Sequence, residues 1–421
     1  MSVAPRDARY TLALLTAVYA LGYADRNIIN LLLDPIKQEY QLSDTIMGLI
    51  TGFGFTAFQT LLGIPLARLA DTSRRVTVLI VGLLMWSVMT GLSGLATSAI
   101  LLAIARMGVG VGEACLTGPA HALLSSNFEK AERPRAFSIM GAGGEIGVIL
   151  AFLVGGWVSH IWGWRAAFFV AGLPGIVLAV IMHLTLKEPP RGETIDRLPA
   201  LPFGAALAEL AQRPSFVIAV LASMAMGLNI FGIQVWSPSY LRRIYALDTA
   251  SVGTTIALLR AGLSVTGAVA GGSIATWCVR RYGQRWFMLF PACICGVSGL
   301  ALLAFLFAPS LAVAIVCLGL VNMTIGAQLG PVFSLIQTVS PIRSRALAAA
   351  LFVSLTQLFG MGLGALAIGA TSDALHASHG EAALRYALLI PAAGALLACL
   401  LYAFGARYVA HDIERAESAV S

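Results

Sequence analysis

Apolar runs of about twenty residues recur along almost the whole chain, and each is long enough to cross the hydrocarbon core of a bilayer as a helix. The pattern predicts an all-α membrane protein with twelve transmembrane helices in its 421 residues. The predicted spans are 10–33, 46–69, 76–96, 98–122, 135–158, 166–186, 214–241, 250–275, 286–307, 310–333, 345–371 and 384–406.

Composition supports lipid as the solvent of this chain. Hydrophobic residues make up 58% and charged residues 11%, with a mean hydropathy of +0.85, whereas a soluble domain carries about 25% charged residues. The cysteines show no paired framework in the loops and no metal-binding spacing, so we expect small hydrophobic side chains at all six positions. They are Cys115, Cys278, Cys293, Cys295, Cys317 and Cys399.

The distribution of basic residues predicts the orientation, because cytoplasmic segments of membrane proteins are enriched in Lys and Arg. With a cytoplasmic N-terminus, most of the 27 basic residues fall in cytoplasmic segments. The first run begins near Tyr10 and is long enough to span, so we expect a first transmembrane helix rather than a cleavable signal. We expect a monomer in the bacterial inner membrane with both termini cytoplasmic. The net charge of +7 follows from this bias and is no sign of nucleic-acid binding. The outer segments hold only Lys37, Arg165, Arg242, Arg243 and Arg385.

The longest cytoplasmic linker, 187–213, divides the chain into two bundles of six helices, 1–186 and 214–421. It begins KEPPRGE, which cannot be helical, and continues FGAALAEL, which could form a short helix on the membrane surface.

The two halves repeat each other, so we expect two pseudo-symmetric bundles with a binding site at their interface, opened alternately to each side of the membrane. Asp71 follows Gly48 by 23 residues, and Thr276 follows Gly253 by the same interval. Two further pairs correspond between the halves: Gly118-Pro119 with Gly330-Pro331, and Arg135-Ala136 with Arg345-Ala346.

Six ionisable residues lie deep inside predicted spans, at least seven residues from either end, where a charge costs at least about 2.5 kcal/mol on insertion scales. Arg106 and Glu113 are seven residues apart on one helix, about 10 Å along its axis, and therefore face the same way. Asp25 and Arg26 are adjacent and point about 100° apart, so they cannot both face one partner. The six are Asp25, Arg26, Arg106, Glu113, Glu145 and Arg260.

The segment GIPLARLADTSRR resembles the signature loop of the major facilitator superfamily, and the resemblance extends over nearly the whole chain. Asp71 matches the acidic position and Arg74-Arg75 the basic ones, which implies a gating role for all three. The chain departs from the pattern at Ala67, where a glycine is usual, and at Thr276, which replaces the acid in the second half.

The segments YADRNIIN, LARLAD and ARMGVGVGEA resemble the spinster family of lysolipid and sphingosine-phosphate transporters. This resemblance implies a secondary transporter, and it implies proton coupling by Asp25, Arg26, Arg106 and Glu113. Apolar surroundings oppose ionisation of a carboxyl group and a nearby arginine favours it, so a movement that separates acid from arginine could drive proton uptake. Asp25 or Glu113 would titrate, with Arg26 and Arg106 as counter-charges. The alternative is a set of buried ion pairs that only fix helix packing.

Several polar residues are candidates for lining a substrate cavity, and each has a simpler interpretation. Glu145 could instead hydrogen-bond a neighbouring helix, Arg260 could extend to the interface or pair with a loop acid, and His121 could be a core histidine. The others could form ordinary interhelical hydrogen bonds. The candidates are Glu145, His121, Arg260, Asn229, Gln234, Asn322, Gln328 and Gln357.

The sequence favours a transporter of an amphipathic substrate coupled to protons; a drug–proton antiporter or an organic-anion porter on the same scaffold is the alternative. GVGVGEA superficially resembles a dinucleotide fingerprint but lacks the strand–turn–helix context, so we assign its glycines, like Gly360 and Gly364, to helix packing. We find no catalytic constellation and no phosphate-binding loop, so we expect no enzyme, no ATP-driven pump, no cofactor and no metal. A receptor or scaffold would not need two repeated bundles with buried titratable groups.

Overall fold

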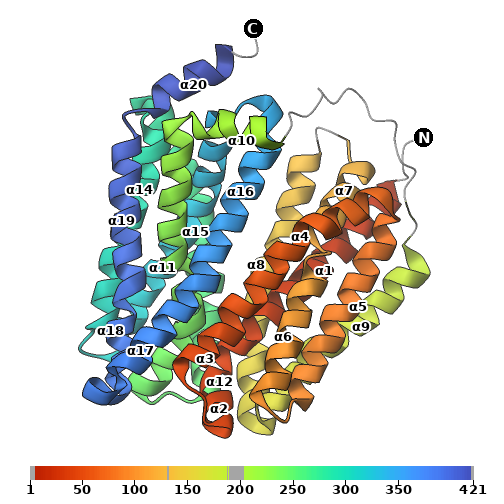
Figure 1. Cartoon of the computed structure of the whole chain (residues 1–421), viewed down its shortest axis with the longest axis vertical. Coiled ribbons are helices and arrows are strands. Elements are labelled where there is room, and N and C mark those ends of the chain that lie inside the picture. Colours follow the sequence, from red (N-terminus) through yellow and green to blue (C-terminus); the bar gives the residue numbers. More distant parts are fainter. Residues whose placement is uncertain (1–4, 130–131, 187, 189–202, 419–421) are drawn as a thin grey trace. The chain divides into compact units, whose positions relative to one another are not determined.

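The computed structural model describes residues 5–129, 132–186, 188 and 203–418, and within these ranges every regular element is a helix (Figure 1). The chain divides into two compact units. The first comprises residues 1–193 and 235–258, and the second comprises 194–234 and 259–421. Helix α11 (Pro214–Tyr245) contributes its first part to the second unit and its last part to the first.

The first unit contains the N-terminal helices and the end of α11, followed by most of α12. Its elements are α1 (Pro5–Leu31), α2 (Leu33–Tyr40), α3 (Asp44–Gly48), the π-helical turn η1 (Leu49–Gly54), α4 (Phe55–Thr72), α5 (Arg75–Leu95), α6 (Ala99–Glu113), α7 (Thr117–Asn127), α8 (Arg133–Trp162), α9 (Trp164–Thr185) and α12 (Thr249–Leu259).

The second unit contains the remaining helices. They are α10 (Phe203–Ala211), the π-helical turn η2 (Arg260–Ser264), α13 (Val265–Tyr282), α14 (Trp286–Leu306), α15 (Leu311–Val339), the 3-10 turn η3 (Ile342–Ser344), α16 (Arg345–Gln357), the π-helical turn η4 (Leu358–Gly364), α17 (Ala365–His379), the 3-10 turn η5 (Gly380–Ala382), α18 (Ala383–Ala387), α19 (Leu389–Gly405) and α20 (Val409–Ser418).

Ten helical segments among the described residues are long and apolar enough to cross a membrane. Nine of them overlap the second to tenth predicted spans, and the tenth, Leu347–Gly405, overlaps both the eleventh and the twelfth. Helix α1 covers residues 10–31 of the first predicted span but is not among the ten, because Asp25, Arg26 and Asn27 interrupt its apolar run.

Glycines let the helices of each unit approach backbone to backbone, as expected where lipid provides no hydrophobic drive for helix association. A Cβ on Gly147 of α8 would lie 1.9 Å from the carbonyl oxygen of Ala20 on α1, and one on Gly360 would lie 2.5 Å from that of Gly227. The predicted packing role of the glycine pairs is therefore confirmed at Gly360, and at Gly112, where the Cβ would meet the Trp86 nitrogen at 2.7 Å.

The second unit ends in a helix that packs against its own core. Val409 and Ile413 of α20 are buried, and the carboxylate of Asp412 accepts hydrogen bonds from the backbone N–H and the hydroxyl of Ser215. Helix α10 coincides with the predicted short helix FGAALAEL, whereas linker residues 189–202 lie outside the described residues.

Candidate functional site

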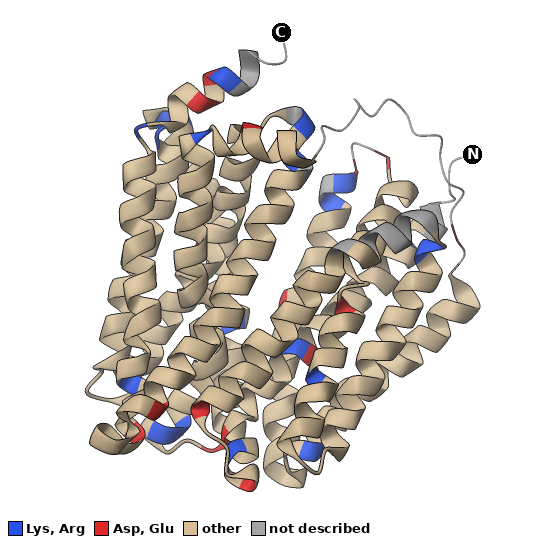
Figure 2. Cartoon of the chain, in the orientation of Figure 1, with Lys and Arg blue, Asp and Glu red and all other residues tan. Residues whose placement is uncertain are grey.

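The four residues predicted to couple protons lie together in the interior of the first unit. Asp25 and Arg26 lie on α1, and Arg106 and Glu113 lie on α6. Their exposed fractions are 1%, 8%, 0% and 2%, respectively. Figure 2 shows most charged residues near helix ends, with a compact group of both signs partway along the helices of this unit. Charges so deeply buried require either mutual pairing or a function.

Arg26 and Glu113 form a direct ion pair. The Arg26 Nη2 and Nε atoms donate to Oε2 of Glu113 over 2.5 Å and 3.1 Å. Gln59 of α4 donates to the same oxygen over 3.3 Å. Three donors therefore converge on one carboxylate oxygen, while Oε1 of Glu113 has no hydrogen-bond partner among the described residues.

Asp25 and Arg106 are buried without such pairing. The Nη1 atom of Arg106 donates to the backbone carbonyl of Asp25 over 3.2 Å. In the described part of the chain, no group hydrogen-bonds either carboxylate oxygen of Asp25, nor the Nε and Nη2 atoms of Arg106. The adjacent residues Asp25 and Arg26 thus make different contacts, as their angular separation predicts.

Aromatic rings surround the two guanidinium groups. The ring of Phe55 lies 5.2 Å from the Cζ of Arg26 and 5.7 Å from that of Arg106, and the ring of Tyr23 lies 5.2 Å from Arg26. An aromatic face attracts a cation through its quadrupole, so these rings replace part of the lost hydration.

The local sequence explains how α6 brings its charges so close to other helices. A Cβ on Gly110 would lie 2.6 Å from the carbonyl oxygen of Phe55, and one on Gly112 would meet the backbone of Trp86. The helix ends at Glu113, and a turn through residues 114–116 precedes α7. The acid therefore occupies the break in the fourth predicted span.

Sequence reasoning missed Gln59, Phe55 and Tyr23 as members of this site. Gln59 gave a signal, since it is an amide within the apolar run FTAFQTLLG. In the sequence, Phe55 and Tyr23 look like any other aromatic residue of an apolar span. Only the approach of α4 and α1 to α6 distinguishes them.

The predicted gating loop joins α4 to α5. The side chain of Asp71 lies outside the described residues. Arg74 occupies the N-cap position of α5 and is exposed, and Arg75 donates from Nη1 to the hydroxyl of Ser126 over 3.1 Å. Sequence reasoning overlooked Glu188, whose two carboxylate oxygens accept from the backbone N–H groups of Arg75 and Val76 over 2.9 Å each. A carboxylate at this position suits the positive end of the helix dipole.

The tentative cavity residues of the second unit lie on several helices, α11, α15 and α16 among them. Asn229 is fully buried, donates to the carbonyl of Pro391 over 3.4 Å and accepts from Ser298 over 3.1 Å, which is the interhelical bonding of the simpler interpretation. Asn322 donates to the carbonyl of Leu318 in its own helix. Gln328 is buried, and within the described ranges its Oε1 accepts no hydrogen bond.

The remaining candidates differ in exposure. Arg260 is 6% exposed and begins the π-helical turn η2, and π-helical turns are frequent at functional sites. Glu145, Gln234 and Gln357 are half-buried. His121 is exposed rather than in the core, and its Nε2 lies 3.1 Å from the hydroxyl of Tyr19.

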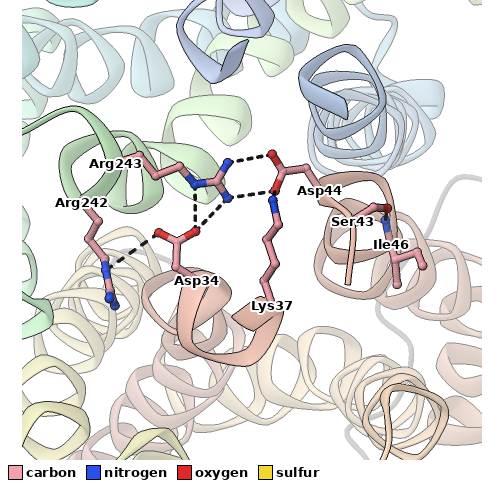
Figure 3. Close-up of polar contacts among 7 residues, drawn as sticks. All are labelled: Asp34, Lys37, Ser43, Asp44, Ile46, Arg242 and Arg243. Atoms are coloured by element: carbon pink, nitrogen blue, oxygen red, sulfur yellow. Dashed lines mark hydrogen bonds and ion pairs between the residues drawn. The ribbon is translucent and has the colours of Figure 1, made fainter. Parts of the chain in front are cut away.

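A second ionic network lies at the other end of the first unit (Figure 3). The Arg243 guanidinium near the end of α11 donates to Asp34 of α2 over 2.7 and 3.0 Å, and to both oxygens of Asp44 over 2.7 and 2.8 Å. Lys37 also donates to Asp44, over 2.6 Å. The two carboxylate side chains are 6% and 3% exposed. The network therefore holds the end of α11 against the α2–α3 segment.

Comparison with known proteins identifies the scaffold. The profile of the Major Facilitator Superfamily matches residues 15–365. The chain is 30% identical to an MFS-type efflux pump of Mycolicibacterium smegmatis over 417 residues, which cover 98% of this chain and 96% of that protein. It is 29% identical to human protein spinster homolog 1 over 254 residues, 57% of this chain and 47% of that protein.

A solved structure covers nearly the whole fold. The crystal structure of a bacterial homolog to the human lysosomal transporter spinster, in an inward-facing and unoccupied conformation, superposes with a TM-score of 0.87 at 25% identity. The match covers 98% of this chain and 99% of that chain. Together with the spanning helices, these similarities establish that the chain is a multi-pass integral membrane protein and belongs to the major facilitator superfamily of transporters, with spinster proteins among its relatives.

Proposed function

We propose that the protein is a proton-coupled secondary transporter of an amphipathic, anionic substrate of the lysolipid or sphingosine-phosphate type, working by alternating access. We place it in the bacterial inner membrane as a monomer with both termini cytoplasmic. Residues 1–186 and 214–421 would act as the two halves of the carrier, joined by the linker 187–213.

The observation that carries the proton coupling is the ion pair of Arg26 and Glu113, with its three donors on one oxygen. Binding of a proton to Glu113 would remove the negative charge that holds the Arg26 guanidinium. Arg26 stays charged, because guanidinium groups do not deprotonate in proteins, so it must find another anion or water. A proton on Glu113 is thereby converted into movement of α1 relative to α6.

The break in the fourth span supports the same step. Because α6 ends at Glu113, a change at this acid acts where the helix is interrupted rather than within a continuous hydrogen-bond ladder. The neighbouring turn can reorient at smaller cost than the interior of a helix.

The proposed substrate class rests on similarity and charge. Spinster proteins are among the relatives, and the family resemblance implies a lysolipid or sphingoid phosphate. Each unit contains a buried guanidinium group, Arg106 in the first and Arg260 in the second, and guanidinium groups bind phosphate well.

A drug–proton antiporter is the second candidate, favoured by one observation. The MFS-type efflux pump of M. smegmatis matches 98% of this chain, whereas human spinster homolog 1 matches 57%. The same ionic site would serve either function, so the two candidates differ in substrate and not in coupling.

Reconstituted transport under an imposed pH gradient tests the proposal. Proteoliposomes would be assayed for uptake of a fluorescent lysolipid and of a cationic dye. The proteins compared are wild type, Glu113→Gln and Asp25→Asn, with Glu132→Gln, a substitution at an exposed acid, as the control. We expect Glu113→Gln to lose the response to the gradient and Glu132→Gln to keep it. Unchanged gradient-driven uptake by both Glu113→Gln and Asp25→Asn would overturn the coupling. Gradient-driven movement of the dye alone would favour the antiporter.

A further inference from the structure

The second unit has a pocket of about 380 Å³ that is remote in sequence from the ionic site. It lies between α13, α14 and α15. One wall is formed by α13, with Gly272, Thr276 and Arg280. The other walls are formed by Trp286 of α14 and by Gly330 and Pro331 of α15.

Helix packing explains why a groove opens here. A Cβ on Gly271 would lie 2.4 Å from the carbonyl oxygen of Ala327, so α13 and α15 touch at this level. Pro331 has no backbone N–H, so the carbonyl of Ala327, four residues earlier, lacks its usual helical hydrogen bond. Next to this contact, a Cβ built on Gly272 or on Gly330 would have no heavy atom of the other described residues within 4 Å, apart from the nearby backbone of its own helix. The two glycines therefore border open space.

The groove lies on a face of α13 that is apolar and exposed. Val265 and Val269 share the helical face of Gly272 and Thr276, because their spacing is four, three and four residues. They are 45% and 69% exposed. Exposed apolar side chains of a membrane-spanning helix suit contact with lipid acyl chains.

The cytoplasmic end of the groove, by the predicted orientation, is basic and aromatic. Arg280 is exposed at its rim, and Arg281 and Arg285 follow. The chain has no Asp or Glu between Asp248 and Asp373, so none of the three helices that form the groove carries an acid. The ring of Tyr282 lies 5.5 Å from that of Trp277 and 5.4 Å from that of Trp286, and such amphipathic rings favour the headgroup level.

We propose that this groove binds one anionic phospholipid of the cytoplasmic leaflet, with its phosphate at Arg280 and an acyl chain beside Gly272 and Gly330. Guanidinium groups hydrogen-bond phosphate oxygens strongly, and the cytoplasmic leaflet supplies anionic headgroups. The bound lipid would fill the open space beside Gly272 and Gly330. The inference concerns a resident lipid and does not depend on the transported substrate.

Lipid titration of the purified, delipidated full-length protein, followed by native mass spectrometry, tests this site. We expect the first phosphatidylglycerol to bind wild type about tenfold more tightly than phosphatidylcholine, because both lipids carry the phosphate but the choline cation of phosphatidylcholine is repelled by the Arg280 guanidinium. Arg280→Gln removes that preference, and Gly272→Leu weakens binding of both lipids because its side chain fills the groove. Matched controls are Arg135→Gln, an exposed arginine of the first unit, and Gly91→Leu, whose Cβ also meets nothing within 4 Å.

Two results would overturn the inference. One is equal binding of the two lipids by wild type; the other is phosphatidylglycerol binding by Arg280→Gln and Gly272→Leu that matches the controls. Should Gly272→Leu not yield folded protein, Gly330→Leu blocks the same groove from α15. Because the readout is binding without transport, its failure is distinguishable from failure of the proposed function.

Discussion

Removal of one partner of the Arg26–Glu113 pair gives an asymmetric loss of stability. Glu113→Gln leaves the Arg26 guanidinium buried with its charge, and a guanidinium group cannot discard its proton. Arg26→Met leaves the carboxyl group of Glu113, which can become neutral by binding a proton. We therefore expect Glu113→Gln to destabilise the protein more than Arg26→Met, although the glutamine keeps an acceptor for the hydrogen bonds.

The magnitude follows from the burial and from the number of donors. Both side chains are nearly inaccessible, at 9% and 1% exposure, and breaking a buried ion pair costs about 3–5 kcal/mol. The loss of charge on the acceptor weakens three hydrogen bonds at once, because Gln59 donates to the same oxygen. We assign Glu113→Gln a loss of about 3–5 kcal/mol and Arg26→Met about half of that.

The double variant Arg26→Met with Glu113→Gln separates pairing from mere burial. It leaves no unpaired charge, so it should regain most of the stability lost by Glu113→Gln while remaining unresponsive to a proton gradient. Thermal unfolding in detergent, followed by size-exclusion recovery, measures the four proteins of this cycle. Additive losses in the double variant, or single variants as stable as wild type, would refute the reasoning, since independent sites add and coupled ones do not.

Three further predictions concern the rest of the molecule. Asp248 accepts hydrogen bonds from the N–H and hydroxyl of Ser251 at the start of α12, and these bonds lower the pKa of Asp248. Asp248→Ala should therefore lower the free energy of unfolding by about 1 kcal/mol at pH 7, and Asp248→Asn should lower it much less. In thermal scans the difference from wild type should vanish as the pH falls through the depressed pKa, where the acid is neutral in both the folded and the unfolded state. Gly271→Ala should destabilise by about 1–3 kcal/mol through overpacking against Ala327, whereas its neighbour Gly272→Ala, which meets nothing, should be tolerated; equal melting temperatures would contradict this. Arg243→Lys should lose nearly as much stability as Arg243→Gln, because an ammonium group cannot contact Asp34 and Asp44 in the bidentate geometry that the guanidinium uses; full stability of the lysine variant would show that charge alone suffices.

The sequence was sufficient to predict the helices, because about twenty apolar residues permit no other element at that length. It was also sufficient to single out Arg106 and Glu113, since charges in such runs are rare and their spacing fixes their common face. It was not sufficient to pair Arg26 with Glu113 rather than Asp25 with Arg106. That choice depends on the rotation of α1 against α6, which no local sequence pattern specifies.

Contacts supplied by backbone groups were invisible in the sequence. Glu188 lies in a segment that reads only as a non-helical linker, and its role appears when the N–H groups of Arg75 and Val76 face it. From the sequence, Asn229 could equally well line a cavity or form a hydrogen bond between helices. Its contacts with Pro391 and Ser298 come from helices more than sixty positions away in sequence, so no local pattern could distinguish the two.

The two buried acids of the site are not equivalent for coupling, although either could carry a proton. A proton acts on the conformation only by changing contacts that the acid makes. On Glu113 it alters three hydrogen bonds that tie α1, α4 and α6 together. On Asp25 it alters none with the described residues, because neither carboxylate oxygen is hydrogen-bonded there. We therefore propose Glu113, rather than Asp25, as the acid through which a proton would move helices. Accordingly, Asp25→Asn should change the affinity for substrate or the rate of uptake while keeping a response to the pH gradient, and a variant that loses only the gradient response would reverse the assignment.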